Sequence, residues 1–334
     1  MSGLLQLADL TRGPGEALLR ATMTLGFSEP VARAGLAAEF AAWTAPGALD
    51  GLLAKVANDR ARSPKAVLVI GASTLPASLL RQVFLSRSLG ARVYVKTASG
   101  QEALAEAMAA VDPEIVPTPF PSGDTLRLRA AIDAVDTVVA LGSDETVAEI
   151  DGLMPFHKTF VGHGHKVSAA WVEHPDEAAA EGLAEDLCAW DQAGCLSPQA
   201  AWVAGDRHAF AERLVAALGR REATLPMTLP ASAARARRVA LTLGRMTGEV
   251  YETATTALVS LEQGGFRPSP GYRLLWLLPP DEEALRALAP RVGLIGTDTS
   301  SPLVPGARTT ALGAMQRPAL GEGDGGLGAL LTAS

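Results

Sequence analysis

Cys195 is the residue in this sequence whose surroundings best suit chemistry. It lies in the segment WDQAGCLSPQ, residues 190–199, among neighbours that are polar, small or turn-forming. A cysteine that only fills a core usually has apolar neighbours, as Cys188 does in AEGLAEDLCAW. A loop cysteine between a helix and a strand can be exposed, and nearby N–H groups can favour its thiolate. We therefore interpret Cys195 as a candidate nucleophile and Cys188 as a packing residue.

A loop of small residues follows the first predicted strand. The segment VLVIGASTLP, residues 67–76, runs from an apolar stretch into a loop that contains Ser73 and Thr74 and ends at Pro76. Loops at the carboxyl ends of parallel strands are where α/β proteins bind ligands. The GxGxxG fingerprint of dinucleotide sites is absent, so an ordinary strand-to-helix turn is the alternative.

A similar loop occurs in VVALGSDETV, residues 138–147. The predicted strand ends at Gly142, and Ser143 then begins a helix with acidic residues in its first turn. A helix N-terminus presents free N–H groups to an anion, and glycine permits a close approach. The alternative is an ordinary capped helix, because serine is a common N-cap.

Two further stretches carry polar side chains that could bind a ligand. Lys96 ends the predicted strand ARVYVK and could bond a ribose hydroxyl or a phosphate, although a solvated surface lysine is the commoner case. His163 and His165 in GHGHK would share one face of a strand. Two histidines without a cysteine or carboxylate at ligand spacing do not make a zinc site, so we predict no metal.

The elements that must position these residues alternate between strands and helices. Residues 1–60 show the three-to-four spacing of helices. After them, amphipathic helical segments alternate with short apolar runs, and this alternation predicts a parallel, doubly wound sheet. The apolar runs lie at residues 65–71, 91–96 and 136–142.

A second α/β block begins near residue 160. We expect FVGHGHKVSAAWVE, residues 160–173, to be one extended segment. We also expect one strand over YETATTALVSLE, residues 251–262, among further helices and strands.

Length, charge and cysteine content limit the classes of protein. A chain of 334 residues exceeds the size of a single hydrophobic core, so we expect two domains. A net charge of −7 with no long basic run argues against nucleic acid or an anionic membrane as partner. Two cysteines form no disulfide framework, and the sequence shows neither a secretory signal nor an apolar run near the ~20 residues of a membrane helix. We therefore expect a cytoplasmic protein.

The order of these motifs resembles the aldehyde dehydrogenase superfamily, and within it the LuxC-type acyl-CoA reductases. The motifs are a small loop ending in Pro76, then V-x-V-K, L-G-S-x-x-T, G-x-G-x-K and Q-x-x-C-x-S-P-Q. FRPSPGYR at 266–273 and LGEGDGGLGALL at 320–331 extend the resemblance to the C-terminal part. It implies an α/β fold of two doubly wound domains with the active site in the cleft between them.

The resemblance also implies three parts along the chain. Residues 1–162 would hold N-terminal helices and the nicotinamide-cofactor-binding domain. Residues 163–305 would form the catalytic domain with the nucleophilic cysteine, and residues 306–334 a tail that returns to the cofactor domain. Relatives carry extra N-terminal structure and a dimer-forming arm that are not recognisable here, so the chain resembles a short variant and a homodimer is left open.

Roles for individual residues follow from the resemblance. Cys195 would be the nucleophile, and Thr74 would stand where relatives carry an asparagine that helps to hold the oxyanion. Threonine keeps a donor, but a shorter one, so the Cys195 N–H would carry more of this role. The cofactor would contact residues of three loops: Ser73 and Pro76, Lys96 and Ser99, and Gly142 and Ser143.

Two departures from hydrolytic aldehyde dehydrogenases favour a reductase. The general base that activates water falls at Gly162, and the ribose-binding glutamate falls near Ser269. A thioester reductase needs no hydrolytic water: Cys195 displaces CoA, hydride reduces the acyl-enzyme, and the thiohemiacetal releases the aldehyde. The absence of a base would suppress competing hydrolysis.

The preferred cofactor is expected to be NADPH, with NADH as the alternative. Enzymes that prefer NAD often carry an acid three residues after the strand-end lysine, where it repels a 2′-phosphate. Here that residue is Ser99. Two other functions are left open: a weakly active or inactive relative that acts by binding, favoured by Thr74, and an oxidising aldehyde dehydrogenase, disfavoured by Gly162.

Overall fold

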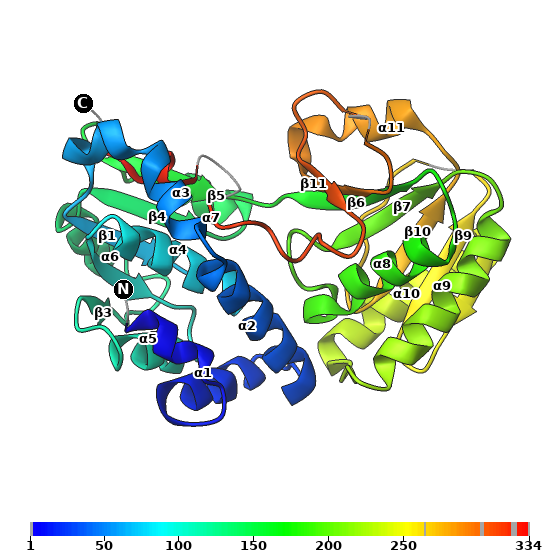
Figure 1. The fold of residues 1–334 in the computed structure, drawn as a ribbon, viewed down its shortest axis with the longest axis horizontal. Coiled ribbons are helices and arrows are strands. Elements are labelled where there is room, and N and C mark those ends of the chain that lie inside the picture. The colour runs from blue at the N-terminus through cyan, green and yellow to red at the C-terminus, as the bar shows by residue number, and fades with distance from the viewer. Residues whose placement is uncertain (1–2, 264, 301–303, 322–325, 333–334) are drawn as a thin grey trace. The chain divides into compact units, whose positions relative to one another are not determined.

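The computed structural model describes residues 3–263, 265–300, 304–321 and 326–332. The chain divides into two compact α/β units (Figure 1). Unit 1 consists of Met1–Leu25, Gly35–His165 and Pro318–Ser334, and unit 2 of Gly26–Ala34 and Lys166–Arg317. The bounds expected from the sequence, 162/163 and 305/306, differ from this division in two ways. Residues 26–34 belong to unit 2 although they lie near the N-terminus, and residues 306–317 belong to unit 2 rather than to a separate tail.

Unit 1 is built on a five-stranded parallel sheet with the order β3-β2-β1-β4-β5. Its strands are short and apolar because helices cover the sheet, and every residue of β4 is buried. The strands are β1 (Ala66–Ile70), β2 (Arg92–Lys96), β3 (Ile115–Pro117), β4 (Thr137–Leu141) and β5 (Thr159–His163).

The helices of unit 1 connect these strands and precede them. The connecting helices are α4 (Pro76–Ser88), α5 (Glu102–Ala109), α6 (Thr125–Asp133) and α7 (Asp144–Asp151). The N-terminal region forms α1 (Gly13–Met23), α2 (Glu29–Thr44) and α3 (Ala48–Lys55), with the short 3-10 helices η1 (Leu4–Ala8) and η2 (Ala57–Arg62). The predicted helical character of residues 1–60 is confirmed.

The C-terminal segment is attached to unit 1 through hydrogen bonds. The side chain of Thr137 donates to the Leu330 carbonyl over 3.1 Å, within the 3-10 helix η5 (Gly326–Leu330). Arg81 forms a buried ion pair with Glu39 and also donates to the Pro318 carbonyl over 3.1 Å. The two hydrogen bonds to the C-terminal segment join residues that are 193 and 237 positions apart in the chain.

Unit 2 contains a seven-stranded sheet with the order β12-β11-β6-β7-β10-β9-β8. All neighbouring strands are parallel except β8, which is antiparallel to β9 at one edge. The strands are β6 (Val167–Val172), β7 (Pro198–Val203), β8 (Gly248–Glu252), β9 (Ala257–Leu261), β10 (Leu274–Leu278), β11 (Val292–Thr297) and β12 (Thr309–Ala311).

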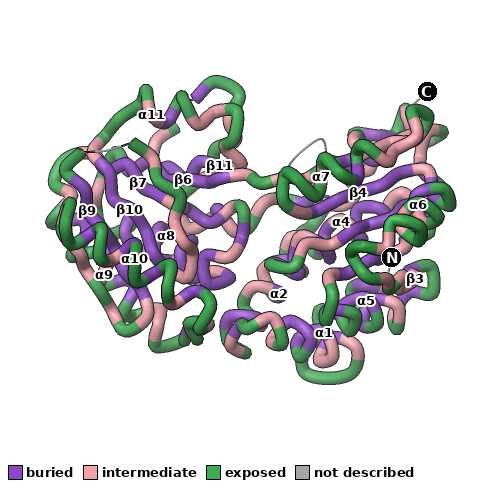
Figure 2. The backbone as a smooth tube through the Cα atoms, turned by 180° about the vertical axis from the view of Figure 1, so that it is seen from behind, coloured by how far each residue is buried: buried purple, intermediate pink, exposed green. Residues whose placement is uncertain are grey.

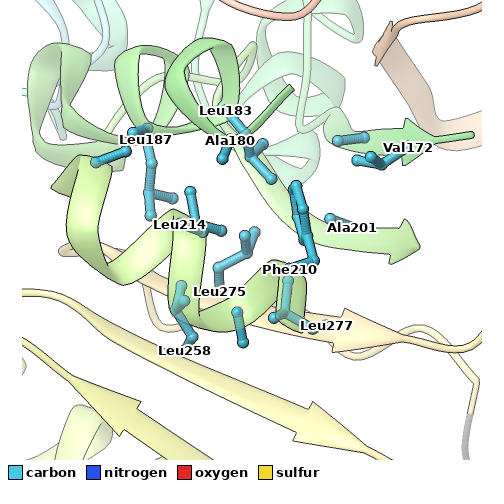
Figure 3. Packing of buried hydrophobic residues seen from close by; sticks show 14 of the residues in the cluster. Val172, Ala180, Leu183, Leu187, Ala201, Phe210, Leu214, Leu258, Leu275 and Leu277 are labelled. Atoms are coloured by element: carbon cyan, nitrogen blue, oxygen red, sulfur yellow. The ribbon is translucent and has the colours of Figure 1, made fainter. Parts of the chain in front are cut away.

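Helices cover both faces of this sheet, because alternate residues of each strand point to opposite faces. On one face, Leu275 and Leu277 pack against α8 (Glu177–Cys188) and α9 (Arg207–Glu222) (Figure 3). On the other face, Leu274, Trp276 and Leu278 pack with residues of α10 (Ala231–Thr247) and α11 (Glu282–Ala287). Figure 2 shows the resulting buried strands in purple. The 3-10 helices η3 (Ala189–Gln192) and η4 (Ala289–Arg291) follow α8 and α11.

Two segments differ from their predicted secondary structure. Residues 160–173 are not one extended element: β5 ends at His163 in one sheet, and β6 begins at Val167 in the other. Residues 251–262 contain the end of β8 and all of β9, which pair with each other. The sequence did not show these breaks, because the residues on both sides of each turn are typical of strands.

None of the helices that the structure describes is long and apolar enough to cross a bilayer.

Asp186 on α8 holds the segment that follows β12. Its carboxylate is buried and accepts hydrogen bonds from the backbone N–H groups of Gly313, over 2.7 Å, and Met315, over 2.9 Å. Burial raises the pKa of Asp186 to about 7, although these N–H donors oppose the shift.

The raised pKa of Asp186 predicts a loss of stability as pH rises. The folded chain binds this proton more tightly than the unfolded chain, so the stabilisation is complete below the ordinary pKa of 3.8 and is lost as pH rises through about 7. The change is at most ~4 kcal/mol. In Asp186→Asn the free energy of unfolding, measured by chemical denaturation at pH 5 and pH 8, should depend less on pH than in the wild type. An unchanged pH dependence would contradict this assignment.

Candidate active site

The loops singled out in the first half of the sequence lie at the point where the strand order of unit 1 reverses. The chain passes from β1 to β2 and β3 on one side, and then returns to place β4 on the other side of β1. Ile70 and Ala140 are paired in register, so the loops that begin at Gly71 and Gly142 leave the sheet side by side. In open α/β sheets this reversal is the usual place for a nucleotide or another ligand.

Ser143 caps the helix that begins at this point. Its Oγ accepts a hydrogen bond from the Thr146 N–H over 3.3 Å. A separate side-chain hydrogen bond from Ser143 lowers the pKa of the neighbouring Glu145. A Cβ on Gly142 would come within 3.3 Å of the Thr146 side chain. The capping interpretation of Ser143 is therefore confirmed, and any contact with an anion would use backbone N–H groups.

Lys96 is buried at the carboxyl end of β2, so the solvated surface lysine is excluded. Its Nζ donates to the Thr97 carbonyl over 3.3 Å and lies 3.5 Å from the Ser122 hydroxyl. The Nζ is also 5.3 Å from the centre of the Phe120 ring. Burial lowers the pKa of Lys96, while the carboxylate of Glu102 opposes the shift. A half-desolvated cation at this edge suits an anionic or polyhydroxyl ligand.

Gln101 joins the loop after β1 to the loop after β2. It is buried, and its Nε2 donates to the Ser73 carbonyl over 2.8 Å. Ser73 itself is exposed, Pro76 begins α4, and Ser99 is exposed in the turn between β2 and α5. Four of the residues assigned to the cofactor, Ser73, Pro76, Lys96 and Ser99, thus belong to neighbouring loops of one unit. Sequence reasoning missed Gln101, whose only signal is a polar residue just before a helix.

Cys195 is exposed in the loop between η3 and β7, whereas Cys188 lies buried in the core between α8 and α9. Burial raises the pKa of the Cys188 thiol to about 11, which makes it a poor nucleophile. The Cys195 carbonyl accepts a hydrogen bond from the Ser168 Oγ over 2.8 Å. Next to it, the Ser197 N–H donates to the Gly194 carbonyl over 3.0 Å and closes a turn. Cys195 therefore combines an exposed side chain with a fixed backbone.

Residues of the segment 266–273, together with Leu274, bond to the residues that lead into the Cys195 loop. Gln192 donates from Nε2 to the carbonyls of Pro198 and Leu274, both over 2.8 Å, and its Oε1 accepts from the Leu274 N–H over 2.8 Å. Arg273 forms an ion pair with Asp191 at 2.6 Å. Sequence reasoning missed these roles; the signal was a set of polar residues at positions that prove to be buried.

Ser269 also bonds to the residues that support the Cys195 loop. Its Oγ donates to the Leu274 carbonyl over 2.6 Å and accepts from the Gly271 N–H over 3.0 Å. Its own N–H donates to the Gln199 side chain over 3.2 Å. Ser269 therefore has a structural role beside the Cys195 loop.

Gly162 is exposed on β5, and its surroundings leave no room for a side chain in the present conformation. A Cβ at this position would lie 2.5 Å from Val147 Cγ1 and 3.0 Å from the Phe160 ring. Contacts this short require the neighbours to move. The position of the expected base therefore carries no carboxylate, and the residues around it leave no space for one.

The predicted oxyanion partners belong to different units. Thr74 is exposed in the loop before α4 of unit 1, and Cys195 belongs to unit 2. Their cooperation remains a prediction. Within the ranges that the structure describes, no three histidine, cysteine or acidic residues are grouped so that they could hold a metal ion.

Sequence comparisons identify a family and several relatives of this chain. A family model described as "Acyl-CoA reductase (LuxC)" matches residues 85–265. The long-chain acyl-protein thioester reductase of Vibrio harveyi is 32% identical over 108 residues, which cover 31% of this chain and 23% of that protein. The enzyme of the same name from Aliivibrio fischeri is 34% identical over 90 residues, or 26% and 19% of the two chains. The matched segments thus span less than a quarter of these relatives.

Solved structures agree on the fold. A NAD-dependent benzaldehyde dehydrogenase from Corynebacterium glutamicum aligns with a TM-score of 0.66 and 14% identity, over 95% of this chain and 82% of that chain. A NAD-dependent aldehyde dehydrogenase from Sinorhizobium meliloti aligns with a TM-score of 0.66 and 16% identity, over 92% and 73%. The predicted aldehyde dehydrogenase-like α/β fold is therefore confirmed. With the family model matching more than half of the chain, the protein belongs to the LuxC family of acyl-CoA reductases.

Proposed function

We propose that this protein reduces an acyl-CoA thioester to the aldehyde through an acyl group carried on Cys195. The observation that carries this proposal is an exposed cysteine on a backbone fixed by hydrogen bonds, in a chain of the LuxC family. A nucleophile must be reachable by substrate yet held in one direction, and the Cys195 loop combines both properties.

The first step is acyl transfer to Cys195. The Sγ thiolate attacks the thioester carbonyl, a carbon–sulfur bond to Cys195 forms, and the bond to CoA breaks as CoA leaves as a thiolate. Negative charge gathers on the carbonyl oxygen in the transition state. We assign its stabilisation to the Cys195 N–H and the Thr74 hydroxyl.

The second step is reduction of the acyl group on Cys195. A reduced nicotinamide cofactor, when bound, supplies the hydride that this step consumes. The loops at the strand reversal of unit 1 fit such a cofactor, because they combine small residues, a helix N-terminus and the buried cation of Lys96. We assign Gly142 and Ser143 to the pyrophosphate, Lys96 to the adenosine ribose, and Ser73, Pro76 and Ser99 to the same cofactor.

The last step releases the product. The thiohemiacetal on Cys195 loses its hydroxyl proton, the carbon–sulfur bond breaks, and the aldehyde leaves while Cys195 returns to the thiolate. The position where hydrolytic relatives carry the water-activating base is Gly162, and its surroundings have no space for a larger side chain. The acyl group on Cys195 therefore persists until it is reduced.

The substrate is proposed to be an acyl thioester of CoA. The curated relatives are named as reductases of acyl-protein thioesters, which react through the same carbonyl chemistry. Parallel assays with acyl-CoA and with an acyl group on a carrier-protein thiol distinguish the two sources. If neither acyl-CoA nor the acyl carrier protein supported consumption of the reductant, the proposal of a thioester substrate would be contradicted.

Cys195 should carry the acyl group when reductant is withheld. After incubation with an acyl-CoA, the peptide containing Cys195 should gain the mass of the acyl group, and NADPH should remove it with formation of aldehyde. Cys195→Ala should form no adduct and lose activity by at least ~10³-fold. Cys188→Ala is the matched control and should keep the adduct. An acyl group on Cys188, or none on either cysteine, would refute the mechanism.

The cofactor preference should depend on residue 99. We propose NADPH as the preferred cofactor, with NADH also accepted, because the exposed Ser99 places no charge against a 2′-phosphate. Ser99→Glu should lower kcat/KM for NADPH about 10-fold through like-charge repulsion, and change that for NADH much less. Ala110→Glu adds the same charge at the far end of α5 and should leave the ratio unchanged. Equal losses with both cofactors would contradict this assignment of Ser99.

A further inference from the structure

The chain enters the Cys195 loop through three successive residues in the left-handed backbone conformation. Trp190, Asp191 and Gln192 have φ angles of 51°, 50° and 62°. A second left-handed pair, Tyr272 and Arg273, has φ angles of 53° and 58°. Residues other than glycine adopt this conformation only where the surroundings impose it, and such positions gather at functional sites.

A buried ion pair joins the two left-handed runs. Nη2 of Arg273 lies 2.6 Å from Oδ1 of Asp191, and the two side chains are 0% and 5% exposed. The same nitrogen donates to the Leu225 carbonyl over 2.7 Å. Burial raises the pKa of Asp191, and the guanidinium of Arg273 opposes this shift and favours the charged carboxylate.

Gln192 continues the connection to the loop itself. Its amide reaches forward to the Pro198 carbonyl and across to both backbone groups of Leu274. Gln192 and Pro198 therefore close residues 193–197, which include Cys195, into a loop with fixed ends. The first residue of β10 is thereby joined to the start of β7.

We propose that Asp191 and Arg273 are positioning residues for Cys195. Their ion pair holds residues 190–192 in the left-handed conformation and so sets the direction in which the Cys195 side chain leaves the loop. This inference rests on the proposed function, because a fixed direction matters only if Sγ must meet a carbonyl at a defined angle. Because both side chains are buried, we assign them an effect on the chemistry only through Cys195.

A second buried ion pair provides the matched control. Arg87 and Asp112 lie 2.9 Å apart in unit 1, with side chains 12% and 7% exposed. Neither residue has a positive φ. Loss of this pair should lower stability, as loss of any buried pair does, without changing the direction of Cys195.

The test compares Asp191→Asn with Asp112→Asn, both in a Cys188→Ala background. Asparagine keeps the shape of aspartate and tolerates the left-handed conformation, so the first variant removes mainly the ion pair. We measure kcat and KM with an acyl-CoA, the pH profile of Cys195 alkylation by iodoacetamide, and thermal unfolding. In Asp191→Asn, kcat should fall at least ~10-fold, with KM and the alkylation plateau at high pH within about 2-fold. Asp112→Asn should keep kcat, KM and the alkylation plateau, and only its thermal unfolding temperature should fall.

Gln192→Met provides a second variant in case Asp191→Asn does not fold, and should lower kcat in the same way. An equal kcat in Asp191→Asn and Asp112→Asn would overturn the positioning role. A parallel fall in the alkylation plateau would also overturn it, because the thiol itself would then have become inaccessible. If the Cys188→Ala parent forms no acyl adduct on Cys195, the proposed function fails, whatever the two variants show.

Discussion

The backbone that leads to Cys195 is the constraint on which this account depends. An exposed thiol has a defined direction only if the chain beneath it cannot move, and here three residues in sequence are held in a conformation that costs roughly 1–2 kcal/mol each. The buried pair of Asp191 and Arg273 and the amide of Gln192 offset that cost. Breaking such a pair by removing one partner leaves an uncompensated buried charge, at a cost of about 3–5 kcal/mol.

The proposed chemistry draws on residues of both units. Unit 1 offers loops of small residues at the reversal of its strand order, with Lys96 buried at the same edge of the sheet. Unit 2 holds the exposed Cys195 and the buried residues that support its loop. At Gly162, where hydrolytic relatives carry the base, the present packing has no space for a larger side chain. The proposed reduction of a thioester is consistent with this position, because it needs no activated water.

Much of the fold could be predicted from the sequence, because the strands of a covered parallel sheet form continuous apolar runs. The runs that became β1, β2 and β4 end at the loops expected to bind ligand. The turn at residues 164–166 could not be predicted, since apolar strands of different sheets flank it. The exposure of Cys195 followed from its polar neighbours, and the structure confirms it.

The support of the site could not be predicted, because it depends on contacts between distant residues. Asp191 and Arg273 are 82 positions apart, and a polar residue in a loop is normally read as solvated. The burial of Lys96 could not be predicted for the same reason, because it depends on the loops around it. The resemblance placed the missing ribose-binding glutamate near Ser269, and this serine bonds to the backbone beside the Cys195 loop.

The central claim is that the acyl group passes to Cys195 before any reduction occurs. A rapid-quench experiment that mixes the protein with excess acyl-CoA, without a nicotinamide cofactor, tests it most directly. We expect a burst of about one CoA released per chain, followed by slow or no further release, and no burst in Cys195→Ala. Release of CoA only after reductant is added would contradict the account.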